Sequence, residues 1–80
     1  LIDVREPHER AADDIGGIHI PLSAFNLTDI PKNKPLLIYC HAGIRSRSAG
    51  EYLVQMGFDD VTNLEGGISE WRQFYSKNKR

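Results

Sequence analysis

The only cysteine of the chain, Cys40, lies between an apolar run, residues 35–39 (PLLIY), and a segment with helical spacing. Gly43, Arg45 and Ser46 follow it closely. A strand that ends at a thiol and continues through a short glycine-containing loop into a helix forms a cradle for anions, because the loop and first-turn amides have no carbonyl partners. The same positive field favours thiolate, the reactive form of cysteine. The sequence therefore predicts that Cys40 is a nucleophile whose anionic substrate or product is held by backbone N–H groups.

Three residues that follow Cys40 have properties suited to a reactive thiol. Gly43 allows the loop to curl because it has no Cβ. Arg45 can place a fixed positive charge near the sulfur or brace the loop, and Ser46 can hydrogen-bond the sulfur or loop atoms. Cations and helix N-termini lower the pKa of a neighbouring thiol. Without this context a single cysteine is most often a small buried hydrophobic residue, and that alternative stays open here.

The segments on either side must position this loop. The near-continuous apolar character of residues 35–39 is typical of a strand covered by helices on both faces of a sheet. A helix follows, and its apolar residues recur at helical spacing: Ala49, Tyr52, Leu53 and Met56. We expect it to begin near Gly43 or Ile44, which aims its first amides at Cys40, rather than at a later capping box over residues 48–51.

Other segments alternate between strand and helix patterns. Predicted strands cover residues 1–4, 18–22 and 61–64, and predicted helical segments cover residues 6–12, 23–27 and 68–75. This alternation is typical of an α/β fold with a central, mostly parallel sheet and helices on both faces. The length of the chain predicts a single domain over residues 1–80. Trp71 is expected in the core, and the basic end of the chain, residues 77–80, is expected to be a solvated helix terminus.

Asp3 and Arg5 stand at the carboxyl end of the first predicted strand. In a parallel α/β sheet this is the edge at which ligands bind. The alternative is that the two residues only hold their own loop by ion pairing and hydrogen bonds. His19 has no metal-ligand or triad partner spaced around it, so we expect it to be a structural or surface residue rather than a base.

The composition is that of an ordinary small globular protein. The 80 residues are 40% hydrophobic and 26% charged, with a net charge of −1. No basic excess indicates nucleic-acid binding, and no apolar run approaches the ~20 residues of a transmembrane helix. One cysteine can neither close an internal disulfide nor by itself hold zinc. We therefore expect no metal site, no cofactor, no membrane contact and a reducing, cytoplasmic location.

The chain also carries a series of short motifs in a fixed order. They are Ile2-Asp3-Val4-Arg5-Glu6, Ile20-Pro21-Leu22, Tyr39-Cys40-His41-Ala42-Gly43-Ile44-Arg45-Ser46, Leu53 with Gly57-Phe58, Val61 with Leu64, and Gly66-Gly67-Ile68 followed by Trp71. In this order and spacing they resemble the rhodanese-like sulfurtransferase domain over nearly the whole chain. The resemblance implies a rhodanese-like α/β fold with a central parallel sheet.

The resemblance also implies an enzyme, similar to thiosulfate sulfurtransferases, with Cys40 as its catalytic residue. Cys40 would take a sulfane sulfur from thiosulfate or a persulfide donor, become a cysteine persulfide, and pass the sulfur to a small thiol, to cyanide or to a protein acceptor. The amides of the loop would hold the persulfide anion: His41, Ala42, Gly43, Ile44, Arg45 and Ser46. Asp3 and Arg5 match a family position that mainly braces this loop.

Two other functions stay open at this point. Protein tyrosine and dual-specificity phosphatases resemble the same stretch, but they carry C-x5-R where this chain has C-x4-R from Cys40 to Arg45. A shorter ring of amides suits a single anionic sulfur better than a tetrahedral phosphate, which argues against a phosphatase or an arsenate reductase. The other alternative is a non-catalytic rhodanese module for interaction or sulfur carriage. Such modules usually lack the cysteine.

Two features depart from the family pattern. Members that prefer thiosulfate typically carry arginine directly after the cysteine, whereas this chain has His41. A neutral imidazole anchors an anion more weakly than guanidinium, so thiosulfate is less expected as the natural donor. The family's usual leading strand and helix are missing before Leu1, and the chain does not begin with methionine. We expect either a trimmed chain, which leaves a removed targeting peptide open, or a minimal form with an exposed sheet edge.

Overall fold

The computed structural model describes residues 1–78, with side chains described through Gln73. Strands and helices alternate along the chain, as the sequence patterns predict. The strands are β1 (Ile2–Asp3), β2 (Ile18–His19), β3 (Leu36–Tyr39) and β4 (Val61–Asn63), and the α-helices are α1 (Pro7–Ala12), α2 (Ile44–Gln55) and α3 (Gly67–Asn78). Two short 3₁₀ helices, η1 (Leu22–Ala24) and η2 (Leu27–Asp29), connect β2 to β3.

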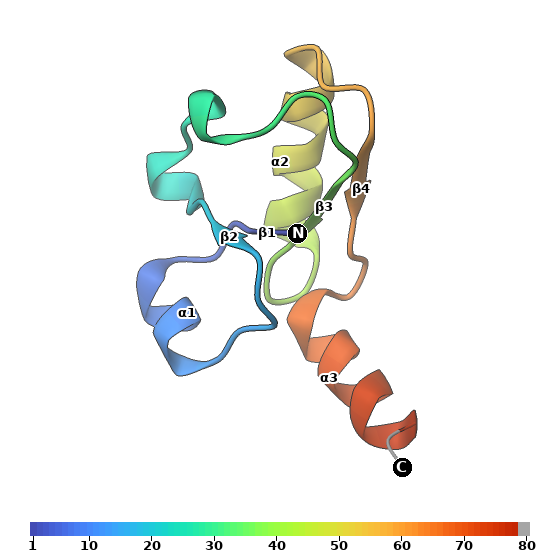
Figure 1. Ribbon diagram of the computed structural model, residues 1–80. Helices are drawn as coiled ribbons and strands as arrows, with labels where there is room; N and C mark the ends of the chain where they lie inside the picture. The colour runs from blue at the N-terminus through green and yellow to red at the C-terminus, as the bar shows by residue number, and fades with distance from the viewer. Residues whose placement is uncertain (79–80) are drawn as a thin grey trace.

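The four strands form one parallel sheet in the order β2-β1-β3-β4. The chain leaves β1 toward β2 on one side, and it leaves β3 toward β4 on the other (Figure 1). The strand order therefore reverses between β1 and β3. In open parallel sheets, ligands bind outside the carboxyl ends of the strands at such a switch point. Asp3 and Cys40 lie at these two carboxyl ends.

The main core lies between α2 and one face of the sheet. Its side chains are apolar residues of β1, β3 and α2 together with residues of the connecting loops. The members at most 5% exposed are Ile2, Val4, Ile20, Ile30, Leu36, Ile38, Cys40, Ala49, Leu53 and Phe58. Burial of these side chains is the main favourable contribution to folding, at about 1.5–3 kcal/mol for each large aliphatic residue.

The α1–β2 loop is bonded to Tyr39 near the carboxyl edge of the sheet. The Tyr39 hydroxyl donates to the carbonyl of Gly16 over 3.1 Å and accepts from the amide of Ile15 over 3.4 Å. Arg72 of α3 pairs with the Asp13 carboxylate, which joins α3 to the same loop. The predicted α/β architecture, a parallel sheet packed with helices, is confirmed.

Several elements differ from their predicted bounds. The strand predicted over residues 18–22 ends at His19, and η1 begins directly after Pro21. The His19 ring nitrogen Nε2 lies 2.7 Å from the carbonyl oxygen of Arg5, so His19 has the structural role that was expected. Trp71 is only half-buried rather than in the core.

Some predictions fall outside what is described. The side chains of residues 74–78, which include part of the predicted apolar face of the last helix, are not described, and residues 79–80 of the basic end lie outside the described residues altogether. Among residues 1–78, no helix combines the length and apolar character that crossing a membrane requires.

Candidate active site

Cys40 follows the last residue of β3 and lies at the floor of the loop that leads into α2. The residue is only 1% exposed. Its sulfur is nevertheless within hydrogen-bond distance of three donors: the amide of Gly43 at 3.1 Å, the amide of Ser46 at 3.4 Å and the hydroxyl of Ser46 at 3.4 Å. A cysteine that only packed in the core would face hydrocarbon instead of converging N–H and O–H groups.

The start of α2 explains why the amides point at the sulfur. Gly43 is the N-cap residue, with a φ of 96° that a residue with a Cβ rarely adopts. This conformation turns the chain sharply enough for α2 to begin at Ile44, as predicted, and not at the later capping box. The first-turn amides of the helix, which have no intrahelical acceptor, are therefore adjacent to Cys40.

The pKa of the Cys40 thiol reflects two opposing effects. Burial disfavours the charged thiolate and raises the pKa. Hydrogen bonds from the Ser46 hydroxyl and from the amides of Ser46, Gly43 and Ala42 favour the thiolate and lower the pKa. The net result is a pKa below the ordinary value of a thiol. The loop therefore stabilises the reactive form of Cys40.

Arg45 reaches from the first turn of α2 to α1. Its guanidinium donates two hydrogen bonds to the Glu9 carboxylate, over 2.6 and 2.7 Å. The Arg45 hydrogen bond lowers the pKa of Glu9 to about 2, and Glu9 in turn raises the pKa of Arg45. Of the two roles predicted for Arg45, this geometry favours bracing of the loop. Glu9 was not among the predicted site residues.

Asp3 and Arg5 form a buried ion pair at the end of β1. The Arg5 side chain donates to both carboxylate oxygens of Asp3 over 3.0 Å, and the Arg5 amide donates to one of them over 3.0 Å. Arg5 also donates to the backbone carbonyls of Glu9 and Asp13. These bonds fix the connection between β1 and α1, the helix that carries Glu9. Bracing of the cysteine loop by Asp3 and Arg5 stays a prediction, with Glu9 as the connection through which it can act.

The carbonyl side of the cysteine loop is bonded to α3. The amide of Ile68 donates to the Cys40 carbonyl over 2.9 Å, and the amide of Ser69 donates to the His41 carbonyl over 3.1 Å. Gly67 makes this contact possible, because a Cβ at that position would lie 2.4 Å from both carbonyl oxygens. A glycine at position 67, the first residue of α3, is therefore required by its close approach to the loop backbone.

The remaining predicted loop residues form the rim of the site. His41, Ala42 and Ile44 are exposed, and Ile44 is 76% exposed. A cavity of about 220 Å³ adjoins the rim. It is lined by Ala42, Gly43, Ile44, Arg47, Asn63, Glu65 and Gly66. The structure thus brings all six predicted residues that follow Cys40 around one loop, with only some of them facing the sulfur.

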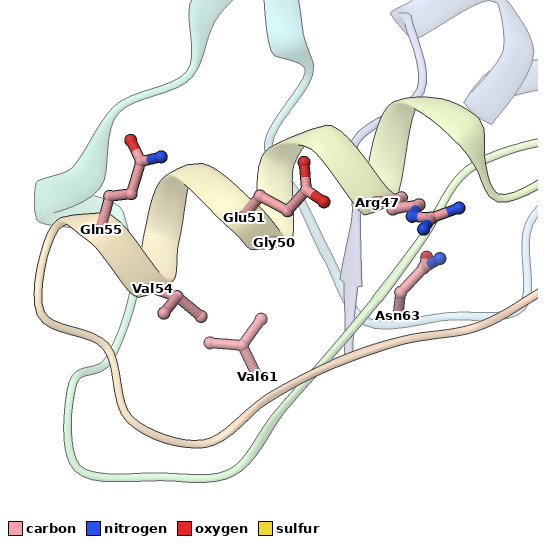
Figure 2. Close-up of a pocket in the computed structure, with 7 residues that line it drawn as sticks. All are labelled: Arg47, Gly50, Glu51, Val54, Gln55, Val61 and Asn63. Carbon is pink, nitrogen blue, oxygen red and sulfur yellow. The ribbon is translucent and has the colours of Figure 1, made fainter.

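Asn63 is a site residue that the sequence analysis missed. It is the last residue of β4, and its amide Nδ2 donates to the Gly43 carbonyl over 3.2 Å. Its carbonyl Oδ1 accepts a hydrogen bond from the Ser46 hydroxyl. Asn63 and Arg47 lie side by side at one end of a second cavity of about 410 Å³ between α2 and β4 (Figure 2). The signal was available, because Asn63 is a polar residue at the carboxyl end of a strand next to β3.

Comparison with known proteins identifies the family. The Rhodanese-like domain family model matches residues 1–74. The chain is 40% identical to a protein named Sulfurtransferase from Allochromatium vinosum, over 89% of this chain and 69% of that protein. It is 35% identical to Thiosulfate sulfurtransferase GlpE from Pseudoalteromonas translucida, over 96% of this chain and 76% of the relative.

Solved structures agree with these matches. A rhodanese-like domain protein from Staphylococcus aureus superposes with a TM-score of 0.81 at 37% identity, over 88% of this chain and 71% of the other. A NAD-dependent persulfide reductase from A. fulgidus superposes with a TM-score of 0.74 at 38% identity, over 88% of this chain but only 13% of that protein. The predictions of a rhodanese-like fold and of a sulfurtransferase enzyme are confirmed. The chain therefore belongs to the rhodanese-like domain family and is similar along most of its length to members named sulfurtransferases.

Proposed function

We propose that this protein transfers sulfane sulfur through a persulfide on Cys40. The observation that carries the proposal is the convergence of three donors from Gly43 and Ser46 on the Cys40 sulfur. These donors favour thiolate over thiol, and the thiolate is the nucleophile. The family match and the similarity to a protein named Sulfurtransferase support the same reaction class.

The reaction has two covalent steps. In the first, the Cys40 thiolate attacks the sulfane sulfur of the donor, the S–S bond to the donor's leaving group breaks, and the leaving group departs with the electron pair. With thiosulfate the leaving group is sulfite. In the second, an acceptor thiolate or cyanide attacks the terminal sulfur, which regenerates the Cys40 thiolate. Sulfur changes partners in both steps, and no external oxidant or reductant is needed.

The loop can hold the persulfide as it holds the thiolate. An S–S bond places the terminal sulfur about 2 Å beyond Sγ, nearer to the loop rim. The first-turn amides of Ile44 and Arg45 lack intrahelical acceptors, and we expect them to face this space. A group of fixed N–H donors around a developing anion acts as an oxyanion hole does. The buried Sγ would thus be presented to acceptors as a more exposed terminal sulfur.

In this proposal the donor is thiosulfate or a persulfide, and the acceptor is a small thiol, cyanide or a protein thiol. Relatives named thiosulfate sulfurtransferase support thiosulfate as one donor. The similar segment of the persulfide reductase is compatible with persulfide donors as well. His41 on the rim lacks the fixed charge of an arginine, so we expect persulfide donors to react at least as well as the thiosulfate dianion.

Trapping the intermediate tests this function. The purified protein is treated with thiosulfate, or with glutathione persulfide, and its intact mass is measured. We expect the mass to rise by one sulfur atom located at Cys40, and to return to the starting value after cyanide or a small thiol is added. The Cys40→Ser variant, the matched control, should not change.

Two results would overturn the proposal. An unmodified thiol under both donors would leave the non-catalytic rhodanese module as the better interpretation. Hydrolysis of an aryl phosphate that is abolished by Cys40→Ser, without any persulfide, would revive the cysteine-loop phosphatase.

A further inference from the structure

The Ser46 hydroxyl has two acceptors and only one proton. Its Oγ lies 3.4 Å from the Cys40 sulfur and is also hydrogen-bonded to Oδ1 of Asn63. A serine hydroxyl can donate one hydrogen bond at a time, although it can accept further ones. The orientation of the Asn63 side-chain amide is fixed by its Nδ2, which donates to the Gly43 carbonyl. The amide oxygen Oδ1 must then face Ser46.

We propose that Asn63 is a positioning residue that competes with the Cys40 sulfur for the Ser46 hydroxyl proton and so limits how strongly the loop stabilises the thiolate. The inference rests on the proposed function of Cys40 as the nucleophile.

The two charge states of Cys40 require opposite hydroxyl orientations. When Cys40 is a thiol, its S–H can donate to Oγ of Ser46 while the hydroxyl donates to Asn63, and all groups are satisfied. When Cys40 is a thiolate, the hydroxyl lone pairs would face a negative sulfur, so the O–H must turn toward Sγ. Asn63 then loses its donor. The Asn63 acceptor therefore favours the thiol. Once the negative charge moves to the terminal sulfur of a persulfide, the Ser46 hydroxyl can donate to Asn63 again.

The surroundings of Asn63 allow this exchange. The residue is half-buried and lines both cavities at this end of the sheet, of about 220 and 410 Å³ (Figure 2). Cavities of this size with polar lining groups admit water. Water can therefore replace Ser46 as the donor to Oδ1, which lowers the cost of releasing the hydroxyl to the sulfur.

A double-mutant cycle separates this role from simple support of the loop. The rate of Cys40 alkylation by iodoacetamide is measured against pH for the unsubstituted protein, Asn63→Ala, Ser46→Ala and the double variant. Asn63→Ala also breaks the bond to the Gly43 carbonyl, but that effect is present in both backgrounds and cancels in the cycle. What remains is the part of the Asn63 effect that acts through the Ser46 hydroxyl.

We expect Asn63→Ala to favour the thiolate of Cys40 when the Ser46 hydroxyl is present. Removing the competing acceptor should shift the thiol–thiolate equilibrium toward thiolate about threefold to tenfold more in the Ser46 protein than in the Ser46→Ala background. Asn63→Asp supplies a stronger acceptor, so its coupling with Ser46→Ala should have the opposite sign. This second variant keeps the side-chain shape, and it serves if Asn63→Ala does not fold.

Charged groups around the site are the same in all proteins of a cycle, so their effects also cancel: Asp3, Arg5, Glu9, His41, Arg45, Arg47 and Glu65. Thr62→Ala, an exposed neighbour on β4, is the matched control and should leave the alkylation profile unchanged. Equal shifts in both backgrounds, or couplings of the same sign for Ala and Asp, would overturn the proposal. Because alkylation involves no sulfur donor, this result is independent of the persulfide test.

Discussion

Glu9 of α1 and Arg45 of α2, which are 36 positions apart in the chain, form a two-bonded ion pair with N–O distances of 2.6 and 2.7 Å. The pair ties α2, the helix that follows the cysteine loop, to α1, the helix that follows β1. Its side chains are 23% and 36% exposed, so solvent screens the pair in part. The pair therefore stabilises the relative position of α1 and α2 mainly through its two directional hydrogen bonds, and less through the attraction of the two charges.

Glu9→Gln should loosen the cysteine loop and change the acid stability of the protein. The folded pKa of Glu9, about 2, lies below the ~4.3 of an unfolded glutamate, so its stabilisation is present above about pH 5 and is lost as pH falls toward 2. We expect the variant to be less stable at pH 7 by about 1 kcal/mol or less. The difference should disappear near pH 2, as followed by urea unfolding.

The matched control for this substitution is Glu51→Gln on the exposed side of α2. It should leave both the stability at neutral pH and the acid transition nearly unchanged. Identical acid transitions in the Glu9→Gln variant and the unsubstituted protein would contradict the role given to the Glu9–Arg45 pair.

Ser46→Ala should raise the pKa of the Cys40 thiol. The substitution removes the hydroxyl that donates to the sulfur but keeps the amide of residue 46 and leaves only a small change in packing. A hydrogen bond to a charged group contributes about 1.5–3 kcal/mol, so the thiolate fraction near neutral pH should fall roughly tenfold or more. The pH dependence of alkylation measures it directly. An unchanged profile would mean that the amides alone set the ionisation of Cys40.

Gly67→Ala should displace the cysteine loop from α3. Gly67 has a φ of 62°, and a Cβ there would meet the carbonyl oxygens of Cys40 and His41 at 2.4 Å. The left-handed conformation and the backbone clash together should cost about 2–4 kcal/mol in the free energy of unfolding, and sulfur transfer should fall with it.

Gly16→Ala provides the control for backbone conformation. Gly16 also has a positive φ, of 93°, but a Cβ added there would have no neighbouring atom within 4 Å. It should lose only the conformational part, about 1–2 kcal/mol, and keep its sulfur-transfer rate. Comparable losses in both variants, measured by denaturant unfolding, would show that the contact with the cysteine loop is not what requires Gly67.

His41→Arg should improve the use of thiosulfate. His41 is exposed on the loop rim, where a guanidinium would add a fixed positive charge near an approaching dianion. A gain of about 1 kcal/mol, the attraction of two unit charges at 4 Å in water, corresponds to roughly fivefold in kcat/KM. Glutathione persulfide, whose reacting end carries less charge, should gain less. Equal gains for both donors would argue against an electrostatic role at this position.

The fold and the cysteine loop could be predicted because their signals are local. The apolar strand before Cys40, the glycine at the turn and the helical spacing after it are adjacent in the sequence, and each favours one conformation. The early start of α2 at Ile44 followed from the same residues. The half-burial of Trp71 was missed because helical spacing gives the direction of a side chain, not how completely a neighbouring element covers it.

The partners of the loop residues could not be inferred from local patterns. Glu9 reaches Arg45, and Asn63 reaches Ser46, only because α1 and β4 are placed beside the loop by the order of strands in the sheet. Sequence spacing does not encode such contacts. Once the order β2-β1-β3-β4 is known, however, polar residues at the carboxyl ends of β1 and β4 become the expected neighbours of Cys40.

The two hydrogen bonds from α3 to the carbonyls of Cys40 and His41 have a consequence for the direction of the loop's peptide groups. A trans peptide plane is rigid, so its oxygen and its hydrogen lie on opposite sides. With both oxygens turned outward to the last helix, the hydrogens of the next residues, His41 and Ala42, are turned inward. The inward direction of these N–H groups is thus set by a distant part of the chain. A shift of α3 alone would turn them, even if every residue of the cysteine loop stayed the same.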